Sequence, residues 1–289
     1  MARHRLRASR RPNRSIGGDV AVLLFLLFLG FFMLLPMVYT VSNAFKPFDE
    51  LWVYPPRFFP RMPTTKNFRD VFRLLSASDV PFLRYVFNTV FISVAGTAGH
   101  LLLASAAAYA LAKMKFRGRD TIFRMIVLSL MFNAPATAVI SYIVMSGLGL
   151  VDNYAAYIVP AFAGTLGLYL MKQFMEQMIP DSLLEAARID GAGELRILGS
   201  IVLPLVKPAW LTLIIFSFLG LWNTGASILV YTESLKTFNY AISQILAGGI
   251  ARAGAGSAVT VIMMIVPILV FIITQSNIVE TMSTSGMKD

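Results

Sequence analysis

Residues 180–210 read PDSLLEAARIDGAGELRILGSIVLPLVKPAW, and the arrangement of the rest of the chain depends on this stretch. It is the longest segment of the second half that a bilayer would exclude, and it lies between two long apolar runs. Ser182 and Glu185 have the spacing of a capping box, which predicts a helix that begins at about residue 182. Gly191 follows where a residue with positive φ would end that helix, and Glu194 begins a second helical pattern.

The second pattern is expected to stop at Pro204, because proline has no backbone N–H to donate. Pro208 is suited to the first turn of the next long helix. Ala186 and Ala187 offer a face of small residues that allows close approach to another surface. The predicted unit is therefore a helix, a glycine turn and a second helix.

The run Glu185-Ala-Ala-Arg-Ile-Asp-Gly191-Ala, with Pro204 and Pro208 behind it, resembles the EAA loop of bacterial ABC importer permeases of the carbohydrate-uptake class, similar to the maltose-type permeases. In that family the loop is cytoplasmic, and its first helix, the coupling helix, docks in a groove of a separate ATPase subunit. This chain departs from the pattern at Leu195 and Leu198, where aromatic residues are common. The alternative is an ordinary amphipathic hairpin that links two membrane helices. The resemblance implies a coupling site formed by Glu185, Ala186, Ala187, Asp190, Gly191 and Pro204.

The composition is that of an integral membrane protein. The chain has 289 residues, of which 57% are hydrophobic and 14% charged, and its mean hydropathy is +0.70. These values are too apolar for a soluble domain of this size. It contains no Cys, and His4 and His100 are far apart in sequence. Disulfides, thiolate sites and a histidine metal cluster are therefore not expected.

The net charge of +10 lies largely beside the apolar runs, where basic residues determine the orientation of a protein in the membrane. We therefore do not expect a nucleic-acid partner. Arginines crowd the first 14 residues, directly before an apolar run, and such a charge holds a terminus in the cytoplasm near anionic lipid. A signal peptide also begins in this way. The apolar run at 20–42 is about 23 residues, or roughly 34 Å of helix, which spans a bilayer, so we expect it to be retained.

The apolar runs predict an all-α protein with six transmembrane helices. The permease domain is expected over residues 20–280, between a basic cytoplasmic tail at 1–19 and a short cytoplasmic tail at 281–289. The spans are expected at about 20–42, 85–112, 121–146 (interrupted by Pro135), 154–174, 209–230 and 256–278, and the EAA loop at 180–208. The basic residues from Lys113 to Arg124 mark a second cytoplasmic loop, which places residues 43–84 and 231–255 outside. The predicted location is the bacterial cytoplasmic membrane.

Other segments share the resemblance. Gly147-Leu-Gly-Leu150 followed by Asp152-Asn is similar to the family's turn between its third and fourth spans, and Leu221-Trp222-Asn223 is similar to a frequent Trp-Asn pair. Asn43-Ala-Phe-Lys46 resembles the usual exit from the first span. The chain has Thr224 where the family usually has an acid or amide, and Ser141 where it often has Pro, so the identity of the substrate is not carried over.

The predicted spans contain no acidic residue, and no Lys or Arg clearly away from an end. This disfavours an ion-coupled secondary transporter, which needs such groups in the membrane. Neutral amides and hydroxyls can instead bind sugar hydroxyls, and aromatic rings can stack on a pyranose. For each such residue the alternative is a hydrogen bond between helices, which is also what we expect of His100. The candidate substrate path consists of Asn133, Tyr142, Trp222, Asn223 and Thr224.

No G-x-x-x-x-G-K-[ST] phosphate loop occurs, so ATP must be hydrolysed by another subunit. We expect this chain to bind no cofactor, with ATP and Mg on the partner. The resemblance implies an ATPase dimer, a second six-span permease (homologous or identical), an extracellular solute-binding protein and a sugar that passes by alternating access. The aromatic residues of loop 43–84 hint at an oligosaccharide. A membrane-embedded structural subunit with no transport role is the other alternative.

Overall fold

The computed structural model describes residues 16–76, 80–132 and 134–285, and this part of the chain is helical, without strands. The candidate Asn133, most of the basic tail and residues 286–289 lie outside the described residues. Four described helical segments are long and apolar enough to cross a membrane: Gly17–Ala44, Phe82–Lys113, Ala155–Met178 and Ala253–Thr274. A fifth is counted if the bent pair Glu194–Leu205 and Lys207–Trp222 forms one span. The six spans expected from the sequence stay a prediction.

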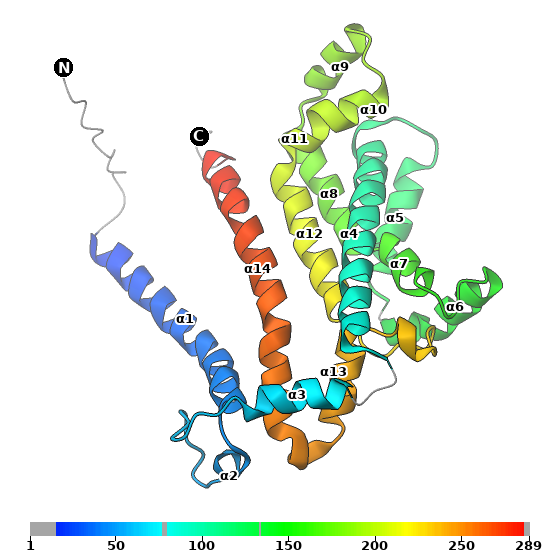
Figure 1. The fold of residues 1–289 in the computed structure, drawn as a ribbon. Helices are drawn as coiled ribbons and strands as arrows, with labels where there is room; N and C mark the ends of the chain where they lie inside the picture. Colours follow the sequence, from blue (N-terminus) through cyan, green and yellow to red (C-terminus); the bar gives the residue numbers. More distant parts are fainter. Residues whose placement is uncertain (1–15, 77–79, 133, 286–289) are drawn as a thin grey trace, which may run out of the picture.

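Helix α1 (Ile16–Ala44) stands apart from the bundle, and α14 (Ala253–Ser285) lies between α1 and α12 (Lys207–Trp222) and contacts both (Figure 1). The most apolar part of α1 buries none of its residues inside this chain. Since such side chains are not stable in water, α1 must be covered by lipid or by another apolar surface. Both α1 and α14 extend into the segments that the sequence suggested as tails.

Helix α4 (Phe82–Lys113) is the central helix of the remaining bundle. It packs against α12 (Lys207–Trp222), α8 (Thr165–Met178) and α7 (Ala155–Phe162). Ala104, Ser105 and Ala108 are buried along it. In lipid there is no hydrophobic driving force between helices, and small side chains instead allow their backbones to approach closely. The small residues at 104–108 therefore explain why α4 lies at the centre of the bundle.

Two predicted spans differ most from the structure, and the fourth is interrupted at residues 163–164, between α7 and α8. The third is not one helix: α5 (Arg119–Ser129) and α6 (Ala134–Gly147) are separate, and Pro135 is the second residue of α6. Proline is tolerated in a first turn and not in a helix interior, which explains the break. The fifth span ends at Trp222 and not near residue 230. The carbonyls of Asn223 and Thr224 instead accept hydrogen bonds from Asn239 and Thr237, which satisfies the open end of α12.

The bundle has two distinct ends (Figure 1). Helices α9 (Asp181–Ile189) and α10 (Glu194–Ile197) lie at the end where α1 begins and α14 finishes. Helices α2 (Phe48–Leu51), α3 (Lys66–Ser76) and α13 (Phe238–Leu246) lie at the opposite end. This separation agrees with the expected topology, in which the loop at 180–208 shares one side with both termini.

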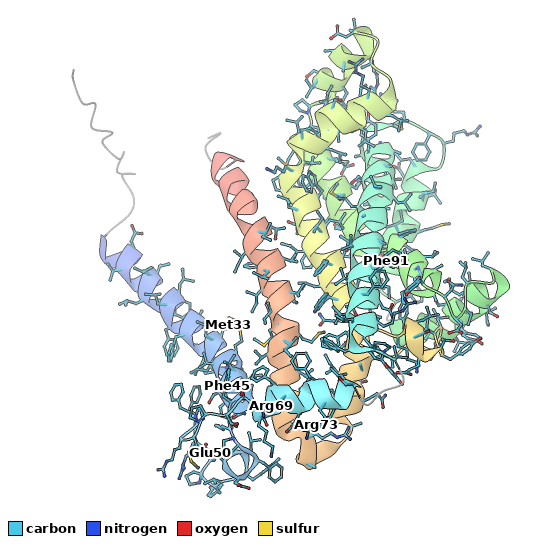
Figure 2. The ribbon with its side chains drawn as sticks, viewed as in Figure 1. Met33, Phe45, Glu50, Arg69, Arg73 and Phe91 are labelled. Atoms are coloured by element: carbon cyan, nitrogen blue, oxygen red, sulfur yellow. The ribbon has the colours of Figure 1, made fainter. Side chains whose placement is uncertain are left out.

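The end opposite α9 is tied together by buried polar side chains, and Figure 2 shows Phe45 and Glu50 at this end. Lys46 is 2% exposed, and its Nζ donates to Asn43 Oδ1 at 2.7 Å and to the carbonyl of Arg57. Asn67 Nδ2 donates to the carbonyls of Ala44 (2.9 Å) and Lys46 (2.7 Å), which takes up free acceptors at the end of α1. The Asn43–Lys46 motif thus stabilises the loop between α1 and α3.

Candidate functional site

The helix expected at residue 182 is present but begins one residue earlier. Helix α9 starts at Asp181, with Pro180 in the N-cap position and no side-chain cap. The capping box predicted for Ser182 and Glu185 is therefore wrong. Proline is already extended at the cap, and Asp181 supplies the negative charge that a helix N-terminus favours.

The glycine turn after α9 forms as predicted. Gly191 has φ +81°, and its N–H donates to the Arg188 carbonyl at 3.0 Å. The N–H of Ala192 donates to the Ala187 carbonyl at 3.0 Å. These two bonds form a complete Schellman motif, which needs the left-handed conformation that glycine adopts without strain.

The second helix of the loop continues past Pro204. Helix α10 leads into a π-helical turn (Leu198–Val202) and then into α11 (Leu203–Leu205), so proline falls inside the helical path. The sharp change of direction follows at Val206, where the path bends by 86° into α12. Trp210 Nε1 donates to the Leu203 carbonyl at 3.0 Å across this bend. Pro208 lies in the first turn of α12, as expected.

Helix α9 has one buried and one exposed face. Leu184 and Ala187, three residues apart, pack into a cluster with Met171, Met175 and Ile197. Full burial of a leucine side chain is worth roughly 1.5–3 kcal/mol, so this face holds α9 on the bundle. Of the six predicted coupling residues, Ala187 is thus turned inward, while the others are exposed: Glu185, Ala186, Asp190, Gly191 and Pro204.

The exposed side of the loop carries two large apolar side chains. Ile189 is 86% exposed and Leu195 is 85% exposed, at either side of the glycine turn. The helices that carry them, α9 and α10, lie at the end of the molecule farthest from α2 and α3 (Figure 1). Exposed apolar side chains beside charged ones are the composition of a protein-binding surface. We call Glu185, Ile189 and Leu195 the tip of the loop at 180–208, which is the predicted coupling loop.

Polar side chains of α4 reach the same loop. Lys113 Nζ donates to Asp181 Oδ1 at 2.8 Å and to the Ile179 carbonyl at 2.7 Å. The hydrogen bond and positive charge of Lys113 hold the pKa of Asp181 below its usual value. The Tyr109 hydroxyl donates to Glu194, which also accepts from Arg188 Nε at 2.8 Å.

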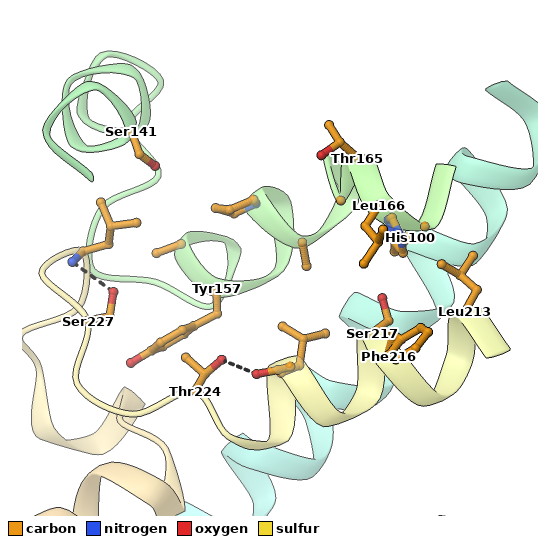
Figure 3. A pocket seen from close by; sticks show the side chains of 18 residues that line it. His100, Ser141, Tyr157, Thr165, Leu166, Leu213, Phe216, Ser217, Thr224 and Ser227 are labelled. Atoms are coloured by element: carbon orange, nitrogen blue, oxygen red, sulfur yellow. Dashed lines mark hydrogen bonds between the residues drawn. The ribbon is translucent and has the colours of Figure 1, made fainter. Parts of the chain in front are cut away.

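A cavity of about 560 Å³ lies between α7, α8 and α12 (Figure 3). This volume is within the range of small-molecule sites. None of its lining residues is Asp, Glu, Lys or Arg. Its polar groups are neutral side chains spread over several elements: His100, Ser141, Tyr157, Thr165, Ser217, Thr224 and Ser227.

The predicted path residues are not gathered in one place. Thr224 lines the cavity, and its hydroxyl donates to the Gly220 carbonyl at 3.2 Å. Trp222 is 4% exposed, donates from Nε1 to the Met263 carbonyl at 3.3 Å and stacks on Phe218. Asn223 Nδ2 donates to Leu219 of its own helix, and Tyr142 is exposed on α6. Neither Trp222, Asn223 nor Tyr142 lines the cavity.

Sequence reasoning missed Ser217, Thr165 and Tyr157 as cavity residues. Single hydroxyls in apolar spans are common, so nothing in the sequence distinguishes these from the rest. A usable signal was the pair Gly164 and Gly167. A Cβ at either glycine would come within 2.6 Å of the His100 ring, so the missing side chains make room for it. His100 Nδ1 lies 3.3 Å from the Phe162 carbonyl, at the break between α7 and α8.

Asp152 joins two loops at the end opposite α9. It has φ +58°, and its carboxylate accepts from the backbone N–H groups of Tyr231 (3.0 Å) and Thr232 (2.8 Å) and from the Thr232 hydroxyl. Desolvation alone would raise the pKa of Asp152, but these hydrogen bonds outweigh it and lower that pKa. The short loop after α6 is therefore fastened to the chain beyond α12 at neutral pH.

Residues 100–284 match the family model described as "Binding-protein-dependent transport system inner membrane component". Protein LplC of Bacillus subtilis is 34% identical over 213 residues, which are 74% of this chain and 70% of LplC. The sulfoquinovosyl glycerol transport system permease protein SmoH of Agrobacterium fabrum is 28% identical over 285 residues, 97% of this chain and 95% of SmoH.

The fold is similar to a chain in the crystal structure of a bacterial ABC transporter involved in the import of the acidic polysaccharide alginate. The TM-score is 0.75 at 25% identity, over 92% of this chain and 99% of that chain. The family match covers both the loop at 180–208 and the cavity. The chain therefore belongs to the binding-protein-dependent transport system inner membrane components, the permease subunits of ABC importers.

Proposed function

We propose that this permease carries an oligosaccharide through the cavity between α7, α8 and α12, driven by an ATPase that docks on the tip of the coupling loop. One observation supports this most strongly: the exposed tip, on a helix whose other face is well packed, lies at one end of helices that line a cavity with six hydroxyl side chains and no charged residue in a mainly apolar wall. Because Leu184 and Ala187 pack α9 against the bundle, α9 would move as a rigid lever and not as a loose linker.

The chemistry of the cavity favours a polyhydroxylated, uncharged region of the solute. Serine and threonine hydroxyls both donate and accept, which matches sugar hydroxyls, and Tyr157 offers a ring for a pyranose face. SmoH is the permease of a transport system for a glycoside, sulfoquinovosyl glycerol, and the alginate transporter imports a polysaccharide. These relatives support a carbohydrate, while the particular sugar would depend on cavity residues such as Thr224.

The partners follow from the proposed mechanism. This chain and a second six-span permease, identical or homologous, would enclose the path. An ATPase dimer would hold ATP and Mg. A solute-binding protein would dock at the end that carries α2, α3 and α13, which we place outside. Closure of the ATPase dimer would move α9 and switch the bundle between inward and outward states.

The orientation can be tested with single cysteines, because the chain contains none. Tyr54 is 93% exposed at one end and Ile189 is 86% exposed at the other. In intact cells, or spheroplasts if an outer membrane is present, a membrane-impermeant maleimide is expected to label Tyr54→Cys at once. Ile189→Cys should react only after the membrane is opened. Labelling of Ile189→Cys in intact cells would place the coupling loop outside and refute the proposal.

The docking role can be tested by reversing the charge of Glu185. Glu185→Lys is expected to leave the amount of membrane-inserted chain unchanged, because the side chain is exposed and outside the spans. Replacing one charge of a buried interface pair costs about 2–5 kcal/mol, so the ATPase recovered in a mild-detergent pull-down should fall by at least about tenfold.

Asp120→Lys is the matched control, since Asp120 is an exposed carboxylate paired with its neighbour Arg119 in the first turn of α5, and α5 begins at the same end of the molecule (Figure 1). It should retain the ATPase. If Glu185→Lys recovers as much ATPase as Asp120→Lys, docking does not involve Glu185. If the unaltered chain recovers no ATPase, the importer proposal itself fails.

A further inference from the structure

Two side chains one helical turn apart near the end of α4 hold α9 at both of its ends. Lys113 is bound to Asp181, the first residue of α9, and Tyr109 is bound to Glu194, which pairs with Arg188 near the last residue of α9. Residues four apart lie on the same face of a helix, so both bonds come from one side of α4. We call this set, Tyr109, Lys113, Asp181, Arg188 and Glu194, the latch.

The α4 side of the latch is buried. The side chain of Lys113 is 7% exposed and Tyr109 is 3% exposed. Exposed ion pairs contribute little because solvent screens them, but a buried donor that loses its acceptor leaves a costly unpaired group. Lys113 Nζ also donates a hydrogen bond to the carbonyl of Ile179, at the end of α8. Lys113 therefore stabilises the turn between α8 and α9. The two contacts fix both the position and the rotation of α9 relative to α4.

Helix α4 connects the latch to the cavity. His100, on the same unbroken helix, lines the cavity and contacts the break between α7 and α8. It lies nine residues before Tyr109, which is roughly 14 Å along an α-helix. A displacement of α9 that is carried through the latch therefore reaches the cavity wall without crossing a flexible segment.

We propose that Tyr109 and Lys113 are positioning residues that transmit movement of the coupling helix to the cavity. This inference rests on the proposed function. The apolar contacts of Leu184 and Ala187 hold α9 on the bundle, while the latch makes α4 follow it. Loss of the latch should leave a chain that is inserted, folded and bound to its ATPase, but whose cavity no longer responds to nucleotide.

The test uses the complex purified with its ATPase and a single cysteine, Ser217→Cys, in the cavity wall. A small methanethiosulfonate reagent is added with and without a non-hydrolysable ATP analogue and Mg, and labelling of this chain is followed by mass. With the latch intact, we expect nucleotide to change the labelling rate by at least about fivefold, the lower end of typical coupling between sites. With Tyr109→Phe and Lys113→Met together, the two rates should become nearly equal.

Three variants control the experiment. Tyr109→Phe alone removes one oxygen and keeps the buried ring, so its nucleotide response should be intermediate. Lys113→Arg keeps the positive charge and the hydrogen-bond donors. When it replaces Lys113→Met in the double variant, much of the nucleotide response should return. Tyr169→Phe removes a tyrosine hydroxyl that donates no hydrogen bond among the described residues, and it should respond as the unaltered chain does.

The outcomes separate the latch from the proposed function. A double variant that binds ATPase and keeps the full nucleotide response would overturn the inference. So would a double variant that loses the ATPase, because the residues would then act on docking. Absence of an ATPase, or of any nucleotide response, with the latch intact would instead refute the proposed function.

Discussion

Gly191→Val is expected to leave the permease in the membrane and to reduce the ATPase that co-purifies with it by at least about tenfold, equal to about 1.4 kcal/mol. Gly191 has φ +81°, and a β-branched residue held in that region costs on the order of 1–3 kcal/mol. The strain is relieved most easily by breaking the two hydrogen bonds that end α9. Because these bonds set the angle between α9 and α10, the tip loses its shape while the spans stay intact.

Gly193→Val is the matched control two residues away. Gly193 has φ −71° and ψ 156°, which β-branched residues favour, and a Cβ there meets no other atom. It should retain the ATPase. Gly191→Asn should lie between the two, because Asn tolerates the left-handed region better than Val does. Equal ATPase recovery for Gly191→Val and Gly193→Val would show that the turn does not position the tip.

Gly220→Trp should block transport while the assembled complex persists. Gly220 lines the cavity, and a Cβ built there meets open space, so an indole can enter the cavity without displacing the helices. Uptake should fall by at least about tenfold, equal to about 1.4 kcal/mol of added barrier. The measurement is depletion of a defined mixture of gluco-, galacto- and galacturono-oligosaccharides from the medium, with ATPase co-purification as the check on assembly.

Gly30→Trp is the control for this substitution. Gly30 lies on the exposed surface of α1, where a Cβ also meets nothing. It adds the same side chain within a span but away from the cavity, so depletion should remain near that of the unaltered chain. If Gly220→Trp supports normal depletion, the solute does not pass through this cavity.

The features that the sequence predicted well are those that depend on neighbouring residues. The left-handed turn at Gly191 and the place of Pro208 follow from the conformations available to glycine and proline. The predicted capping box was wrong because the start of α9 depends on Pro180 and on a contact that is distant in sequence. Pro180 begins the helix without help from a side chain, and Asp181 is held by Lys113, which is 68 residues away in sequence.

The features that the sequence did not predict depend on tertiary contacts. Tyr109 pairs with Glu194 across 85 positions, and no local pattern marks that pair. Ser217 and Thr165 are separated in sequence, and they share a cavity only because α8 and α12 pack beside α4. The early end of α12 depends on acceptors being taken up by Thr237 and Asn239, which lie beyond an irregular segment.

The lack of burial of α1 within this chain has a consequence for how much its amino-acid sequence specifies. Within this chain its most apolar part, which has mean hydropathy 2.8, packs into no core, so the order of its leucines and phenylalanines encodes almost no internal fit. Composition alone keeps such a helix in a bilayer. Related chains should therefore differ in residue order along α1 wherever no partner packs on it, whereas the few positions just beyond its end, such as Lys46, must be kept one by one.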